Sequence, residues 1–194
     1  MVNLHDAARR GDAQALRRAL ASGASPDPRD AQGRTPLLIA TIGNHPDAAR
    51  ALIEAGADVN AQADNRDSPF LYAGAEGRNE ILRLTLPKAD LKSTNRYDGT
   101  ALIPACHHGH VETVKLLLAT GIDRDHVNRL GWTALLEAVI LGDGSATYDA
   151  IIGLLLDARA NPNIPDRDGV SPLAHARARG FQSIARRIAA AGGR

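Results

Sequence analysis

The chain has 194 residues, of which 44% are hydrophobic and 3% aromatic, and its formal net charge is +1. A chain this apolar is not disordered, and without any run of like charges it has no bulk electrostatic basis for binding nucleic acid or an anionic membrane. Because aromatic residues are scarce, the core must consist of Ala, Leu, Ile and Val, which suit closely packed helices better than a thick sheet sandwich.

A short motif recurs along the chain and divides it into units. A Ser or Thr is followed by Pro or Ala and a bulky apolar residue, at Thr35-Pro36-Leu37, Ser68-Pro69-Phe70, Thr100-Ala101-Leu102, Thr133-Ala134-Leu135 and Ser171-Pro172-Leu173. Successive copies begin 33, 32, 33 and 38 residues apart. An alanine stands five residues after each hydroxyl residue, at Ala40, Ala73, Ala105, Ala138 and Ala176. Ala7 lies 33 residues before Ala40 and indicates an abbreviated first unit.

Each unit carries the signals of two helices. The Ser or Thr is a good N-cap, and Pro is tolerated after it because that amide has no partner within the helix. The first helix, helix A, is predicted to end at a residue that turns left-handed, at Gly11, Asn44, Gly77, Gly109, Gly142 and Gly180. The next segment is apolar at helical spacing, as in Val111, Val114 and Leu117, and predicts helix B. Helix B stops at Gly23, Gly56, Gly121 or Gly192 and leads into a turn-rich connector.

In chain order these signals predict a capping unit at residues 1–30, full repeats at 31–64, 65–96, 97–129 and 130–167, and a closing unit at 168–194, all within one domain, residues 1–194. The fold class is all-α, a solenoid of stacked antiparallel helix pairs. The repeated alanine lets neighbouring helices approach closely without weakening the helix as glycine would. Because no unit can bury its apolar face alone, the core is a continuous seam between neighbours.

The residues match a known family. Residues Gly33-Arg34-Thr35-Pro36-Leu37-Leu38-Ile39-Ala40, Ile53-Glu54-Ala55-Gly56-Ala57-Asp58-Val59-Asn60 and Gly109-His110-Val111-Glu112-Thr113-Val114-Lys115-Leu116-Leu117-Leu118 strongly resemble the ankyrin repeat. The resemblance covers essentially the whole chain and is similar in character to small bacterial ankyrin-repeat proteins. It implies hairpin-like loops that project from a curved stack. It also implies that the loop tips and the exposed, concave side of helix A form the recognition surface.

The chain departs from the family pattern in three places. The usual His two residues before the repeated alanine is replaced in every unit, by Leu38, Leu71, Ile103, Leu136 and Ala174. Its loop-stabilising hydrogen bonds must therefore be missing or replaced. The second full repeat is one residue short and has Thr85-Leu86-Pro87-Lys88-Ala89 where the family has a Gly, so an irregular helix end is expected. The fourth full repeat has Arg159 at the corresponding position.

The loop tips supply the first candidate binding residues. Four residues before each capping hydroxyl stand Ala31, Asp64, Arg96, Arg129 and Arg167, and the last three predict an arginine ladder. Tyr97, Leu130 and Trp132 stand beside these arginines, and an exposed aromatic residue next to Arg is typical of interface hot spots. The alternative is that the ladder arginines pair with neighbouring Asp and Asn residues. Trp132 is predicted to be exposed unless it folds onto helix A of its own unit.

The exposed side of helix A supplies the second set. Ile140 and Leu141 are more apolar than a solvated helix face should be, and with Leu130 and Trp132 they predict a contact patch centred on the third and fourth full repeats. The predicted partner-binding residues are Tyr72, Arg96, Tyr97, His107, His108, Arg129, Leu130, Trp132, Ile140, Leu141, Tyr148 and Arg167.

The spacing of 38 residues indicates an insertion of about five residues, 143–147, directly before Tyr148. Insertions in solenoids map to loops on one face, often the binding side. The alternative is a tolerated, floppy connector.

Catalytic and metal chemistry find little support. Cys106-His107-His108-Gly109-His110 is rich in metal-ligand types, but adjacent helical residues diverge by about 100° and rarely converge on one ion. Residues 142–144 are too short for a phosphate-binding loop, and no Ser-His-Asp arrangement has a nucleophile elbow. We therefore expect no enzyme, no cofactor and no metal.

The sequence favours a monomeric scaffold that binds another protein. The alternative is an anionic-ligand or nucleic-acid binder that uses Arg96, Arg129 and Arg167, but Asp64, Asp98, Asp125, Asp166 and Asp168 lie on the same loops and would cancel the field. A metal-binding or ligand-sensing module at His107 and His108 is a more remote third possibility. With one cysteine and no apolar span or signal sequence, the chain is expected in the cytoplasm, or in the periplasm if a leader was removed.

Overall fold

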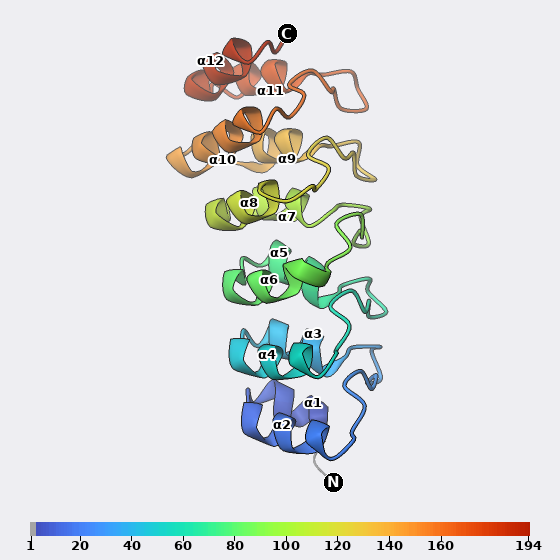
Figure 1. Ribbon diagram of the computed structural model, residues 1–194. Helices are drawn as coiled ribbons and strands as arrows, with labels where there is room; N and C mark the ends of the chain where they lie inside the picture. Colours follow the sequence, from blue (N-terminus) through green and yellow to red (C-terminus); the bar gives the residue numbers. More distant parts are fainter. Residues whose placement is uncertain (1–2) are drawn as a thin grey trace. The chain divides into compact units, whose positions relative to one another are not determined.

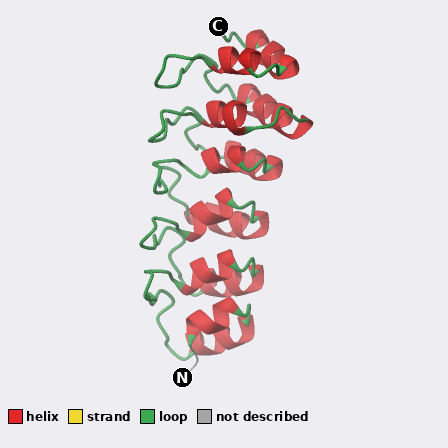
Figure 2. Cartoon of the chain, turned by 180° about the vertical axis from the view of Figure 1, so that it is seen from behind, coloured by secondary structure: helices red, strands yellow, loops and turns green. Residues whose placement is uncertain are grey.

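A computed structural model describes residues 3–194, and within that range every regular element is a helix (Figure 2). The all-α prediction is confirmed. The chain divides into two compact units, the first ending at Arg96 and the second beginning at Tyr97. The assignment of residues 1–194 to one domain stays a prediction.

The first unit holds three helix pairs: α1 (Leu4–Arg9) with α2 (Ala13–Ala21), α3 (Pro36–Ile42) with α4 (Pro46–Glu54), and α5 (Pro69–Ala75) with α6 (Asn79–Thr85), followed by the 3-10 helix η1 (Leu86–Lys88). The second unit holds α7 (Leu102–His107) with α8 (Val111–Leu118), α9 (Ala134–Leu141) with α10 (Ala146–Asp157), and α11 (Pro172–Ala178) with α12 (Gln182–Ala190). Within each unit, helix A packs on the next helix A and helix B on the next helix B, while loops project to one side (Figure 1).

The repeated alanine is completely buried in every helix pair. Its six copies, Ala7, Ala40, Ala73, Ala105, Ala138 and Ala176, are all 0% exposed. The bulky apolar residue that follows each cap is also buried, as are Leu16, Leu52, Leu82, Leu117 and Leu155 of the B helices. Within each unit the core is therefore a seam of small and branched aliphatic side chains between successive pairs, as the composition predicts.

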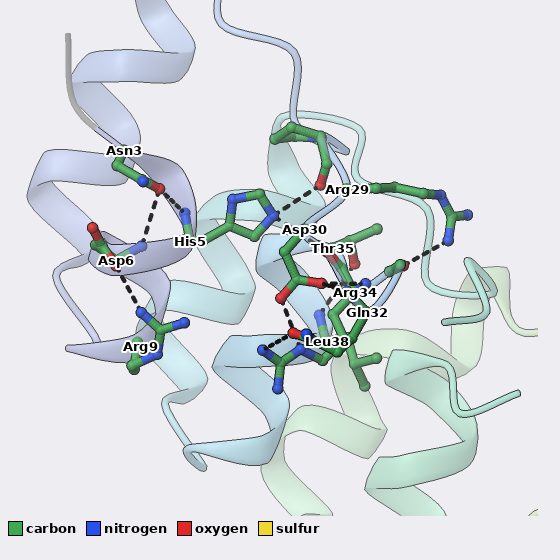
Figure 3. Close-up of polar contacts among 12 residues, drawn as sticks. Asn3, His5, Asp6, Arg9, Arg29, Asp30, Gln32, Arg34, Thr35 and Leu38 are labelled. Atoms are coloured by element: carbon green, nitrogen blue, oxygen red, sulfur yellow. Dashed lines mark hydrogen bonds and ion pairs between the residues drawn. The ribbon is translucent and has the colours of Figure 1, made fainter. Parts of the chain in front are cut away.

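Hairpin loops and capped helices follow from short-range hydrogen bonds, shown for the first full repeat in Figure 3. Thr35 accepts a hydrogen bond from the Leu38 N–H at 3.2 Å and so caps α3. The Asp30 carboxylate accepts from the Gln32 and Arg34 amides at 3.0 and 2.9 Å. The Asp30 amide donates to the Arg34 carbonyl at 3.0 Å and closes the hairpin. Ser68, Thr133 and Ser171 cap their helices in the same way.

In the second unit, side chains one residue after the family's histidine position tie the loop to helix A. In the closing pair, His175 Nε2 of α11 lies 2.6 Å from Asp166 Oδ2 of the preceding loop. At the same two positions one repeat earlier, Asn128 Nδ2 donates to Glu137 Oε2 of α9 at 3.4 Å. The prediction that every unit lacks the histidine is wrong for the capping unit, because His5 of α1 stands two residues before Ala7 and its Nε2 lies 3.1 Å from the Pro28 carbonyl and 3.2 Å from the Arg34 carbonyl.

The third full repeat breaks the capping rule. Helix α7 begins at Leu102, and the buried hydroxyl of Thr100 has no hydrogen-bond partner in the described part of the chain. In the other repeats the residue four positions after the cap donates to the cap carbonyl, as Ile39 does to Thr35 at 3.1 Å. Here that residue is Pro104, which has no N–H, and the Thr100 carbonyl accepts from Ile103 instead. The prediction that Thr100 caps its helix is therefore wrong.

This difference predicts opposite effects for one substitution at two matched positions. Thr35→Val removes a cap and should lower the free energy of unfolding by about 1–2 kcal/mol. Thr100→Val removes a buried hydroxyl that makes no hydrogen bond, so it should be neutral or stabilise by up to about 1 kcal/mol. Urea denaturation followed by circular dichroism measures both. Equal losses at the two sites would contradict the assignment.

The insertion changes the end of one helix and the start of the next. Gly142 has φ −65° and ψ 161°, so the prediction that it turns left-handed is wrong, and Gly144 at φ 76° adopts that conformation. A Cβ atom at Gly142 would collide with the Ala138 carbonyl and the Tyr148 ring, which explains the glycine there. Residues 146 and 147 begin α10, which has 12 residues. The insertion thus forms part of an extended helix α10. Neither alternative from the sequence, a loop on the binding side or a floppy connector, describes it fully.

Arg179 caps the altered end of α9. Its Nη1 donates to the Val139 carbonyl at 3.1 Å and also to the Ile140 carbonyl. Its guanidinium lies 4.6 Å from the centre of the Phe181 ring. Basic side chains at a helix C-terminus satisfy carbonyl groups that lack intrahelical donors. The closing pair thus completes the helix that the insertion leaves without its left-handed glycine.

Arg179→Ala should therefore lower the free energy of unfolding by about 1–2 kcal/mol, because two hydrogen bonds and a cation–π contact are lost. Arg177→Ala on the same helix is the matched control, since Arg177 is exposed and should change stability by less than about 0.5 kcal/mol. Thermal unfolding of the two variants compares them directly. Indistinguishable melting temperatures would rule out the capping role.

The two remaining irregularities occur where expected. Helix α6 ends at Thr85 and continues as the 3-10 helix η1 through Lys88, so the prediction of an irregular helix end is confirmed. Arg159 takes φ 64° at the position where the family has glycine. A non-glycine residue in this conformation is uncommon, so the turn here is set by the surrounding packing.

Candidate partner-binding surface

Two adjacent loops of the second unit expose apolar side chains at their tips. Tyr97 is 48% exposed and Leu130 is 46% exposed. They occupy equivalent positions, three residues before Thr100 and Thr133, and the Arg129 amide donates to the Tyr97 carbonyl at 2.8 Å. The backbones of the two tips are therefore in direct contact, and both residues lie where the sequence predicts.

The arginines at the tips contact their neighbours. Arg129 Nη2 lies 3.2 Å from Asp98 Oδ2, and both side chains are largely exposed. Arg167 donates a hydrogen bond to the Arg129 carbonyl. Arg129 thus pairs with an aspartate as the alternative describes, whereas Arg167 contacts a backbone carbonyl. Arg96 is exposed at the end of the first unit. An exposed ion pair contributes little to stability, so Arg129 can exchange Asp98 for a partner's carboxylate at small cost.

Trp132 corrects the sequence interpretation, because it is half-buried. The chain has already turned back at this position: the Asn128 amide donates to the Trp132 carbonyl and the Trp132 amide to Asn128 Oδ1, both at 3.0 Å. Residues at the same position in the other loops, Arg34, Asp67, Gly99 and Val170, are also half-buried or buried. The position belongs to the returning arm of the hairpin rather than to its tip.

The helix A surface of the second unit carries two histidines and two aliphatic residues. Leu141 is 41% exposed and Ile140 is half-buried. His108 is exposed, and its ring centre lies 4.8 Å from that of His107, whose side chain is 43% exposed. This surface is mixed apolar and aromatic, as predicted.

Two predicted tyrosines have different surroundings. Tyr148 is half-buried, and its hydroxyl donates to the His107 carbonyl at 2.6 Å. It therefore anchors the start of α10 on α7, which is a structural role. Tyr72 is half-buried on α5 of the first unit.

A buried carboxyl lies next to this surface. The Glu137 side chain is 8% exposed, and its Oε1 is 3.6 Å from His107 Nδ1. Burial raises the pKa of Glu137 to about 7, against the lowering effects of the Asn128 hydrogen bond and His108. Burial also lowers the pKa of His107, and the neighbouring His108 lowers it further. At 3.6 Å the two groups are close but do not form a hydrogen bond.

The raised pKa of Glu137 has a measurable consequence for stability. The folded chain holds a proton that the unfolded chain, with a pKa near 4.5, has released. Stability therefore falls as the pH rises from the unfolded to the folded pKa and levels off above it. Glu137→Gln avoids this loss, so the variant should match the wild type near pH 4.5 and exceed it by about 1–3 kcal/mol at pH 8. Urea denaturation at the two pH values tests this, and an equal difference at both would contradict it.

Sequence reasoning missed Val127, which is 46% exposed in the second of the two loops. In the first unit the equivalent residues are polar and reach the next loop: Arg29 donates to the Gln62 carbonyl, and Gln62 donates to the Thr94 carbonyl at 2.8 Å. Comparing this position across the repeats would have shown that Val127 cannot make such a bond. Of the five large hydrophobic residues exposed in the described chain, four lie in the second unit: Tyr97, Val127, Leu130 and Leu141.

Other kinds of site receive no support within residues 3–194. No group of three His, Cys, Asp or Glu side chains is placed to hold a metal ion there. Cys106 is fully buried, and burial raises the pKa of its thiol. A search of the same residues finds no helix that could span a membrane.

The helix pairs, their buried alanine column and the projecting hairpins define a helical repeat protein. A family model described as ankyrin repeats (3 copies) matches residues 4–95 and 70–166. The ankyrin repeat protein YahD of Escherichia coli (strain K12) is 42% identical over 188 residues, which are 96% of this chain and 94% of that protein.

Solved structures of ankyrin repeat domains have the same fold as this chain. An ankyrin repeat domain from Acinetobacter baumannii AYE is 55% identical with a TM-score of 0.97, and 98% of each chain is covered. The ankyrin repeat domain of Bcl-3, a member of the IkappaB protein family, is 31% identical with a TM-score of 0.88, covering 100% of this chain and 87% of that one. The chain belongs to the ankyrin repeat family. Ankyrin repeats are generally non-enzymatic modules for protein–protein interaction, and the matched family is not a catalytic one.

Proposed function

We propose that this protein is a non-enzymatic scaffold that binds another protein through the loop tips and the helix A surface of its second unit. The observation that carries the proposal is the concentration of exposed large hydrophobic residues, at Tyr97, Val127, Leu130 and Leu141. Isolated exposed hydrophobic residues need no explanation, but residues gathered on adjacent loops and a helix surface are typical of interaction sites.

The chemistry around these residues supports a protein partner. Tyr and Arg are enriched among residues that dominate binding energy, and Tyr97 lies beside Arg129. The charge of Arg129 is compensated by Asp98, so the tips do not form a continuous uncompensated basic strip. A polyanion would require such a strip. The anionic-ligand alternative therefore has less support than protein binding.

A double variant tests the proposal. Tyr97→Ala with Leu130→Ala removes the two exposed tip side chains, and the affinity for the physiological partner should fall at least tenfold, which corresponds to about 1.4 kcal/mol. The partner is first captured with the wild-type protein from cells that carry it and identified by mass spectrometry. Its affinity for purified wild type and variant is then measured by calorimetry.

The matched control is Ile42→Ala, which truncates an exposed hydrophobic residue of α3 in the first unit. It should bind the partner as the wild type does. A partner that binds the double variant with unchanged affinity would show that the tips of residues 97 and 130 are not the recognition surface.

A further inference from the structure

Three elements of the proposed binding surface meet at Glu137. The residue belongs to α9, its carboxyl lies 3.6 Å from His107 of α7, and it accepts a hydrogen bond from Asn128 of the preceding loop at 3.4 Å. The residues Glu137 and Asn128 are each 6% exposed. Both contacts are long for a charged carboxylate, because charge-assisted hydrogen bonds from nitrogen donors usually measure about 2.7–2.9 Å. The carboxyl is therefore buried without the donors that a permanent negative charge requires.

Asn128 links this carboxyl to the loop tip. Its Oδ1 accepts from the Leu130 amide at 2.9 Å and from the Trp132 amide at 3.0 Å, while its Nδ2 faces Glu137. The amide group is planar and rigid, so a movement of Nδ2 toward Glu137 also moves Oδ1. Asn128 thus provides a direct hydrogen-bonded connection between Glu137 and the backbone that carries Leu130.

The elements packed against α9 carry other titratable and charged groups, several of which have partners of their own. On α11, His175 is tied to Asp166, and Arg179 donates to the carbonyl groups of α9. On α10, Asp149 pairs with Arg187 at 2.7 Å, and the Tyr148 hydroxyl donates to the His107 carbonyl. On α7, Cys106 is a neutral buried thiol, and His107 and His108 are the imidazoles closest to the carboxyl.

The closing repeat provides an internal comparison. At the positions of Asn128 and Glu137 it has Asp166 and His175, whose side chains meet at 2.6 Å. Hydrogen bonds from the Val170 amide and from His175 lower the pKa of Asp166, so that carboxylate stays ionised at neutral pH. The same loop-to-helix link is thus a close hydrogen-bonded pair at 2.6 Å in one repeat and a long contact at 3.4 Å in the other.

We propose that Glu137 is a proton-operated switch that sets the conformation of loop 128–132 through Asn128, and that it thereby makes partner binding at this loop depend on pH. The last step rests on the proposed function. When protonated, the carboxyl is neutral and tolerates the long contact with Asn128. When the proton leaves to solvent past the partly exposed His107 ring, the carboxylate draws the Asn128 Nδ2 donor closer and shifts the Leu130 and Trp132 amides. Burial holds this transition near neutral pH, at a pKa of about 7.

The lone tryptophan of the chain reports this switch without any partner. Trp132 lies in the loop that Asn128 holds, so its intrinsic fluorescence should change with pH, with a midpoint near 7 in the full-length protein. Glu137→Gln should abolish this transition, and Asn128→Ala should abolish the Trp132 signal while leaving the carboxyl to titrate. Glu54→Gln, an exposed residue of α4, is the matched control and should keep the wild-type curve.

A transition near pH 7 that persists in Glu137→Gln would overturn the proposal, as would a wild-type emission spectrum that does not change between pH 5.5 and 8.5. His107→Asn separates the two titrating groups: a transition lost in this variant and retained in Glu137→Gln would assign the effect to the imidazole and refute the switch. Circular dichroism at both ends of the range shows that each variant is folded. Because no partner is present, the result is independent of whether the proposed binding function is correct.

Discussion

Close contact between neighbouring helices at a fully buried alanine is the constraint on which the rest of the protein depends. Within each compact unit, helix A of one pair can approach helix A of the next pair because the alanine has a single methyl group as its side chain, and all six copies of this alanine are excluded from solvent. A longer side chain would separate the helices and leave voids around the branched residues beside them, and such voids are costly in a close-packed interior. The alanine column therefore fixes the spacing at which loops and helix surfaces repeat within each unit.

Because of this regular spacing, residues at the same position in successive repeats line up in a column on the surface of each unit. Residues at the tip of each hairpin face solvent, while residues on its returning arm lie against the protein, as the pairs Leu130 with Trp132 and Asp64 with Asp67 show. A partner can therefore be recognised through tip residues that do not pack in the core. Within the second unit, Tyr97 and Leu130 occupy one such column and are linked through the Arg129 amide.

The irregularities of the chain concentrate in the same unit. Pro104 prevents the Thr100 carbonyl from accepting the usual hydrogen bond, the insertion changes the end of α9, and Glu137 makes a long contact with Asn128 where the closing repeat has a close His175–Asp166 contact. Each departs from the arrangement that repeats elsewhere and weakens or relocates a local bond. Local rules are commonly violated at functional sites, where other contacts compensate. Arg179 and Tyr148 provide such compensation here, since both satisfy carbonyl groups at the ends of A helices.

The sequence by itself determined the number of helix pairs, their order, the buried alanine column and the exposed tips. All of these follow from the repeat period and from residues whose local preferences are strong. Only the tertiary structure decided that Trp132 is half-buried, that Gly142 is extended and that Glu137 lies against His107, because each depends on contacts between segments far apart in the chain. The repeat predicts which column a residue occupies, whereas the neighbouring repeat determines what its side chain touches. In residues 128–137 the arrangement depends on Asn128, which accepts hydrogen bonds from two loop amides and donates one to the buried carboxyl of Glu137.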